Sequence, residues 1–86
     1  MRADKVILYP MMTEKAISLI ESQNTISFVV EPLSTKDDVK AAVEKLYNVK
    51  VASIRSCVMP RGKKKVYVKL REDFKASDLA IKLGLL

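Results

Sequence analysis

The chain has 86 residues, with 16 Lys and Arg against 10 Asp and Glu, which gives a formal net charge of +6. Hydrophobic residues make up 49% and charged residues 30%, values typical of a folded chain rather than a disordered one. This length fits one domain spanning residues 1–86. No apolar run approaches the roughly 20 residues of a membrane helix, and the first residues resemble no secretory signal. With Cys57 as its one cysteine, we expect a cytoplasmic protein without membrane insertion.

The residue types argue against catalysis. The chain contains no histidine, the commonest general base and metal ligand. Cys57 has no second cysteine beside it, so a packing role is expected. Two glycines cannot build a phosphate-binding Gly-rich loop. We therefore expect no enzyme, no metal, no cofactor and no small-molecule substrate.

The first third of the chain predicts a strand, a helix and a second strand. Residues 5–9 predict a short strand closed by Pro10, and Thr13 has the character of a helix N-cap. That helix is expected to end near Asn24. Residues 25–30 alternate in polarity with the apolar positions even-numbered, which predicts a strand buried on one face only.

The clearest helix follows Pro32. Either Ser34 with Asp37 or Thr35 with Asp38 has the spacing of a capping box. An i, i+3, i+4, i+7 pattern predicts the buried stripe: Val39, Ala42, Val43 and Leu46.

Residues 49–70 predict a β-hairpin whose tip, residues 59–65, is basic. The apolar positions change from odd to even within the first strand, which predicts a bulge near Ala52-Ser53. Ser77 is expected to cap a last short helix, with Gly84 past its end. The order strand, helix, strand, helix, strand, strand, helix indicates an α+β fold, a mostly antiparallel four-stranded sheet with helices packed on it.

The positive charge is concentrated in this hairpin. Between residues 55 and 69 there are six basic residues and no acidic one, and the rest of the chain balances at ten of each sign. The six are Arg55, Arg61, Lys63, Lys64, Lys65 and Lys69. Lysines that protect a strand edge explain a few of these, but contact with phosphates explains the whole set better.

Four further residues are candidates for the same phosphate-binding surface. Tyr67 shares a strand face with Lys65 and Lys69, where it either stacks on a base or ribose or is simply a partly exposed strand tyrosine. Near the starts of the two predicted helices, further phosphate contacts are expected from Lys15, Lys36 and Lys40.

Four motifs in register resemble one family. Pro10-Met11-Met12-Thr13-Glu14-Lys15 resembles the Pro-x-x-[Ser/Thr]-Glu-Lys signature of the universal L-twenty-three (L23) family of large-subunit ribosomal proteins. Residues 24–30 and 64–70 resemble its second and closing strands. The central helix and strand of the family match here at Lys36, Val39, Ala42, Val43, Glu44, Leu46, Tyr47, Val49 and Val51.

The resemblance implies a structural constituent of the large ribosomal subunit that binds large-subunit ribosomal RNA near the nascent-peptide exit. It implies a neighbour of the L-twenty-nine family and a docking surface for the signal recognition particle, the translocon or other exit-site factors. In bacterial relatives the Glu of the signature contacts a ribosome-bound chaperone, so Glu14 is the candidate docking residue. Its other interpretation is a first-turn residue that suits the helix dipole.

The chain departs from the family pattern at two places, and two other functions remain as alternatives. Arg55-Ser56 stands where the family often has Asn-Thr, which favours phosphate contact over base readout. Residues 60–64 form a short connection, as in archaeal-type members, so nascent-chain sensing through that loop is not carried over. The alternatives are an adaptor that binds an acidic protein and a small enzyme of ferredoxin-like fold, a fold whose element order differs from this one.

Overall fold

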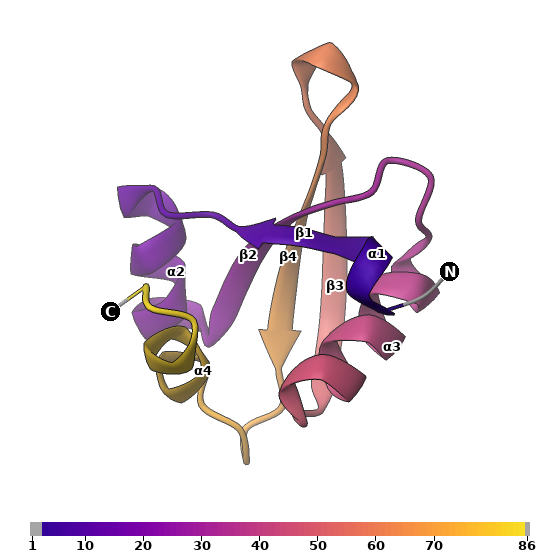
Figure 1. Ribbon diagram of the computed structural model, residues 1–86. Helices are drawn as coiled ribbons and strands as arrows, with labels where there is room; N and C mark the ends of the chain where they lie inside the picture. The colour runs from indigo at the N-terminus through magenta and orange to yellow at the C-terminus, as the bar shows by residue number, and fades with distance from the viewer. Residues whose placement is uncertain (1–2, 86) are drawn as a thin grey trace.

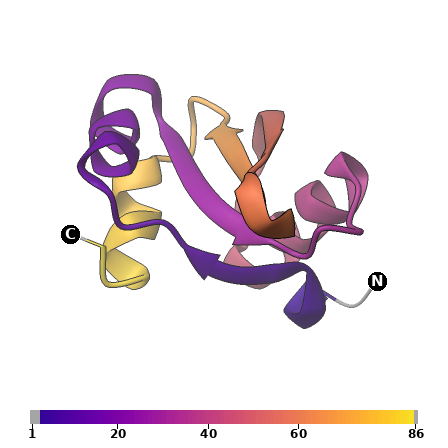
Figure 2. The same ribbon diagram turned by 90° about the horizontal axis from the view of Figure 1, so that it is seen from above.

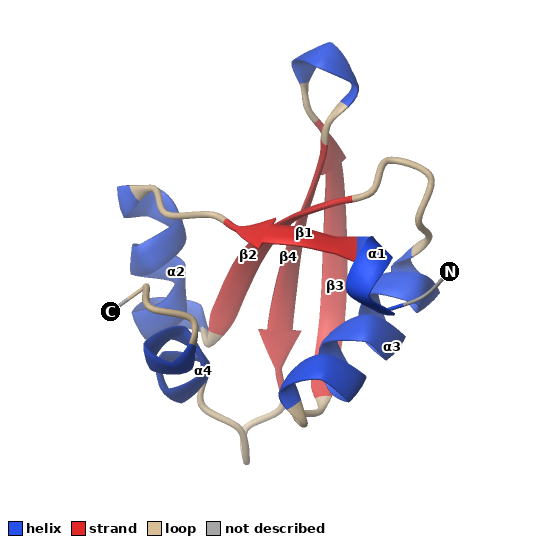
Figure 3. Ribbon diagram, viewed as in Figure 1, coloured by secondary structure: helices blue, strands red, loops and turns tan. Residues whose placement is uncertain are grey.

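The computed structural model describes residues 3–85, and within them helices pack against one four-stranded sheet (Figures 1 and 3). The elements in chain order are α1 (Ala3–Val6), β1 (Ile7–Pro10), α2 (Glu14–Gln23), β2 (Thr25–Val30), α3 (Lys36–Tyr47), β3 (Val51–Val58), the short 3-10 turn η1 (Pro60–Gly62), β4 (Lys64–Leu70) and α4 (Ala76–Lys82). The strand order is β1-β2-β4-β3, and every neighbouring pair is antiparallel. The predicted α+β class and order are confirmed, with α1 added before the first strand.

The strand expected at residues 5–9 starts later than predicted. Residues 3–6 form the single turn α1, and β1 begins only at Ile7. Val6 and Ile7 are both buried in the core. Two successive inward-facing residues are incompatible with the alternation of a strand, but a helical turn that leads into a strand allows them.

Side chains cap α2 and α3 as their sequences predict. The hydroxyl of Thr13 accepts a hydrogen bond from the Ala16 amide at 3.1 Å. For α3 the capping box uses Thr35 and Asp38, with reciprocal bonds of 3.1 and 3.0 Å. The bond from the Thr35 backbone amide lowers the pKa of the Asp38 carboxyl. Ser34, the alternative cap, is buried and donates its hydroxyl to the Glu31 carbonyl at 2.6 Å.

The buried stripe of α3 runs one residue further round the helix than predicted. Val39, Ala42 and Val43 are buried as expected, but Leu46 is 44% exposed. Tyr47 packs against the core instead, stacked on Phe28 with ring centroids 5.8 Å apart. The helix therefore continues its i, i+4, i+8 row from Val39 through Val43 to Tyr47.

The prediction that β2 is buried on one face only is wrong, because all six of its residues are buried. β2 lies between β1 and β4, so it has no free edge. Its odd-numbered side chains are short, and the longer Lys65, Tyr67 and Lys69 lie directly opposite Val29, Ser27 and Thr25. These β4 side chains shield the second face of β2.

The predicted hairpin and its bulge are both confirmed. The pairing of β3 with β4 shifts between Val51 and Ser53, so Val51 and Ile54 both face the core side. The far end of the hairpin extends past the helices (Figure 1), which leaves Val58 76% exposed. At the tip Arg61 and Gly62 both have left-handed backbone, with φ of 71° and 76°.

Asn24 ties together parts of the chain that are far apart in sequence. Its left-handed backbone ends α2. Its side-chain amide donates to the carbonyls of Leu70, Arg71 and Phe74 at 3.2, 3.3 and 2.8 Å. Its side-chain oxygen accepts the Ala76 amide at 2.6 Å. One side chain thus joins the end of α2 to the end of β4 and the start of α4.

The expected role of Ser77 as the cap of the last helix is wrong. α4 begins at Ala76, two residues earlier than a helix capped by Ser77 would, and Lys75 at the N-cap position makes no side-chain capping bond. Asn24, 52 residues before Ala76, takes over the capping. A local sequence pattern cannot predict a cap supplied from so far along the chain. Gly84, with φ of 79°, follows the helix as expected.

We predict that Asn24→Gly lowers the free energy of unfolding by about 2 kcal/mol or more, because it removes four side-chain hydrogen bonds to partly buried or exposed backbone groups of three separate segments. Asn48→Gly is the matched control. Asn48 also ends a helix in the left-handed region, with φ of 56°, and glycine adopts that conformation freely. Urea unfolding of both variants should therefore show a large loss for Asn24 and a small change for Asn48; equal losses would contradict the bridging role.

We also predict that Leu46→Ala changes the free energy of unfolding by less than about 1 kcal/mol, since the side chain is half exposed. Ile20→Ala, in the equivalent part of α2, should cost about 2–5 kcal/mol because Ile20 is buried. The comparison is made by urea unfolding. Similar costs for the two would show that Leu46 packs into the core after all.

Candidate nucleic-acid interface

The sheet has one face turned away from the core, which we call the open face. Alternation places the even-numbered residues of β2, together with Val66, Val68 and Leu70 of β4, in the core, and Ile54 of β3 packs against it. The odd-numbered residues share the opposite face. They are Thr25, Ser27, Val29, Ser53, Arg55, Cys57, Lys65, Tyr67 and Lys69.

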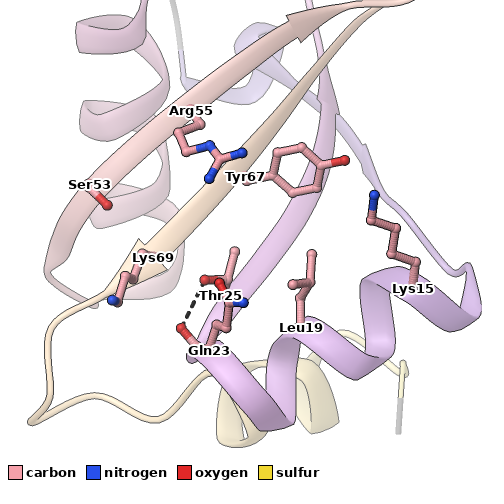
Figure 4. Close-up of a pocket in the computed structure, with 8 residues that line it drawn as sticks. All are labelled: Lys15, Leu19, Gln23, Thr25, Ser53, Arg55, Tyr67 and Lys69. Atoms are coloured by element: carbon pink, nitrogen blue, oxygen red, sulfur yellow. Dashed lines mark hydrogen bonds between the residues drawn. The ribbon is translucent and has the colours of Figure 1, made fainter.

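The open face contains a hollow of about 370 Å³ between α2 and the sheet. Side chains from α2 form one wall, and β2, β4 and β3 form the floor and the other wall (Figure 4). Its lining residues are Lys15, Leu19, Gln23, Thr25, Ser53, Arg55, Tyr67 and Lys69. Three of them are cations and none is acidic, so this open-face hollow is a positively charged site.

Tyr67 lies at the centre of the cations. Arg55 is its direct cross-strand partner on β3. The Lys65 ammonium lies 5.1 Å from the centroid of the Tyr67 ring, within the range of a cation–π contact. Side-chain hydrogen bonding to Tyr67 raises the pKa of Lys65.

The hairpin tip extends this charged surface beyond the sheet (Figure 1). Arg61 and Lys63 are both exposed there. The Lys63 ammonium reaches back to the Tyr9 hydroxyl of β1 at 3.4 Å. A view from above shows the tip over the end of the sheet, between β1 and α3 (Figure 2).

Three of the predicted contact residues lie elsewhere. Lys64 alternates with Lys65 and turns to the other side of the strand, where its ammonium donates to the Ser34 carbonyl at 2.6 Å. Lys36 and Lys40 line a separate groove of α3 and β3. Lys15, by contrast, does join Arg55, Tyr67 and Lys69. Glu14 is exposed in the first turn of α2.

The sequence reasoning missed four lining residues: Leu19, Gln23, Thr25 and Ser53. A signal for two of them was present, because Lys15, Leu19 and Gln23 follow one another at i, i+4 and i+8 and so share one side of α2. The other two depend on the sheet. Thr25 belongs to the odd-numbered face of β2, which lies beside Lys69 of β4, and the bulge at Ala52 places Ser53 on the same face as Arg55.

Across residues 3–85, no group of three or more Asp, Glu or Cys side chains is arranged to hold a metal ion. None of the described helices combines the length and the apolar character needed to cross a bilayer.

The comparison with known families agrees with the resemblance seen in the motifs. A family model described as Ribosomal protein L23 matches residues 5–79, which include every strand of the sheet and both long helices. Proteins of this family are generally structural rather than enzymatic, and membership indicates a ribosomal, cytoplasmic location. The chain belongs to the ribosomal protein L23 family and is a structural component of the large ribosomal subunit.

Proposed function

We propose that the open face and the hairpin tip bind large-subunit ribosomal RNA. The observation that carries this proposal is the open-face hollow, which gathers Lys15, Arg55 and Lys69 around Tyr67 without a carboxylate among its lining residues. Lys65 continues the charge along β4 toward Arg61 and Lys63 at the tip.

Phosphate neutralisation supplies most of the affinity in this proposal. The backbone that carries these cations needs no ordering on binding, because its strands are already fixed by cross-strand pairing. Arginine adds a planar fork that matches a phosphate group bidentately. Arg55 stands where the family often has an asparagine, and this change from an amide to a guanidinium therefore favours contact with the RNA backbone.

Lys64 has a supporting role in this proposal. Its bond to the Ser34 carbonyl links the base of the hairpin to the loop before α3. That link holds the hairpin at a fixed angle to the sheet, so Arg61 and Lys63 project in a constant direction.

We propose that Lys36 and Lys40 add contacts where RNA passes the outer side of β3. These contacts are weaker because the acidic Asp37 lies in the same groove.

We further propose that the protein lies near the nascent-peptide exit, beside the protein of the L-twenty-nine family, and contributes to docking of the signal recognition particle, the translocon or another exit-site factor. Family membership supports this placement. Glu14 and Met12 are both exposed at the start of α2, and Met12 is 67% exposed. Methionine is enriched at protein interfaces, and the Glu14 carboxylate would repel RNA phosphates, so this surface suits a protein partner better than RNA.

We predict that log affinity for large-subunit RNA falls with log salt at a slope of roughly −3.5 to −4.5, as expected for about five phosphate contacts. Arg61→Ala with Lys63→Ala should make that slope shallower by about 1.4 to 1.8. Electrophoretic mobility shifts over a salt series measure it. The control is Lys45→Ala with Lys82→Ala, two exposed lysines on α3 and α4, which should leave the slope unchanged.

The same experiment separates RNA binding from the adaptor alternative. An adaptor for an acidic protein predicts no shift of structured RNA by the wild-type chain and capture of protein after nuclease treatment. That pair of results would overturn the proposed RNA interface.

We predict that Glu14→Lys leaves assembly into the large subunit intact and weakens docking of an exit-site factor about tenfold or more, because it reverses the charge on an exposed first turn. Binding of purified signal recognition particle to ribosomes carrying the variant measures the effect. Ser18→Lys, an exposed position one turn further along α2, is the matched control. Equal loss in both variants would indicate a general charge effect rather than a role for Glu14.

A further inference from the structure

We infer that the open-face hollow receives one unpaired ribonucleotide, with its base stacked on Tyr67 and its flanking phosphates bound by Lys15, Arg55 and Lys69. This inference rests on the proposed RNA-binding function and names the RNA feature that the open face recognises.

The size of the hollow favours a single nucleotide. Its volume of about 370 Å³ lies at the lower end of small-molecule sites, which span roughly 300–1,000 Å³. The groove of a duplex displays only base edges, because the faces of paired bases are stacked on one another. An unpaired base in a bulge or loop has a free face to offer, and RNA recognition commonly uses such bases on aromatic side chains.

The ring of Tyr67 is available for this stacking. Tyr67 lines the hollow, whereas Lys65, whose ammonium lies 5.1 Å from the ring centroid, does not. Tyr67 thus contacts the Lys65 ammonium and also contributes its side chain to the lining of the hollow.

Three different elements supply the cations round this ring. Lys15 comes from α2, Arg55 from β3 and Lys69 from β4 (Figure 4). A nucleotide whose base enters the hollow carries a phosphate on each side of its ribose. Cations on separate walls can bind both phosphates at once, which a single row of lysines along one strand cannot do.

The polar residues of the hollow favour RNA over DNA. Thr25 donates its hydroxyl to the Gln23 carbonyl at 2.9 Å, so the lone pairs of the Thr25 oxygen remain free to accept a bond. Ser53 on the opposite wall is exposed. Hydroxyls of this kind can bond the ribose 2′-OH, the group by which proteins distinguish RNA from DNA.

The test uses the full chain and two RNA duplexes of equal length that differ in one bulged nucleotide, 2-aminopurine. The wild-type chain should bind the bulged duplex more tightly than the paired one and quench the fluorescence of the bulged base. Tyr67→Leu should reduce affinity for the bulged duplex by roughly 5- to 150-fold and abolish the quenching, since stacking on an aromatic ring contributes that much per base. Affinity for the paired duplex should change little.

Two further variants keep the test informative. Tyr67→Phe retains the ring and should retain the quenching, which shows that the ring and not the hydroxyl is needed, while the retained affinity of Tyr67→Leu for the paired duplex guards against a folding defect in that variant. Lys63→Ala, at the hairpin tip outside the hollow, should weaken both duplexes equally. A bulged duplex of DNA with the same sequence should bind more weakly than the RNA.

The outcomes separate this inference from the function on which it rests. Equal wild-type affinity for bulged and paired RNA, or equal losses of both in Tyr67→Leu, would overturn the nucleotide site while leaving the charged RNA interface in place. No binding of either RNA would overturn the interface itself and the nucleotide site with it.

Discussion

The architecture depends on the side chain of Asn24. The backbone of Asn24 ends α2 in a left-handed conformation. Its side-chain amide bonds carbonyls that follow the end of β4, and its side-chain oxygen caps α4, which has no local cap. Because α2 forms one wall of the open-face hollow and β4 its floor, the same bonds fix the distance between the two. The asparagine is buried only in part, yet the charged site keeps its shape through it.

Strand alternation then divides the molecule into a core and a binding surface. On β4, Val66, Val68 and Leu70 fill the core while Lys65, Tyr67 and Lys69 cover the open face. Each residue of β4 therefore faces either the core or the open face, and a register shift of one position would move every side chain to the opposite face. The bulge at Ala52 performs that exchange once in β3, and it returns Ser53 and Arg55 to the open face.

Much of this arrangement was predictable from the sequence because it follows local rules. Period-two alternation predicted the hairpin, the hydroxyls of Thr13 and Thr35 predicted two caps, and six cations without an acidic residue among them marked the charged surface. What was missed depends on tertiary neighbours. The exposure of Leu46 reflects where α3 meets Phe28, the diversion of Lys64 reflects a carbonyl thirty positions away, and the cap of α4 comes from Asn24. The hollow itself exists only because α2 packs beside the sheet.

The position of β3 has a consequence for the protein before it reaches the ribosome. β3 is an edge strand of eight residues with one side free of pairing, and a free edge invites another chain to add a strand. Charge and a bulge are two features that oppose such pairing, and β3 carries Arg55 and the irregularity at Ala52. Arg55, which we propose to contact RNA, thus also disfavours the pairing of β3 with a strand of another chain.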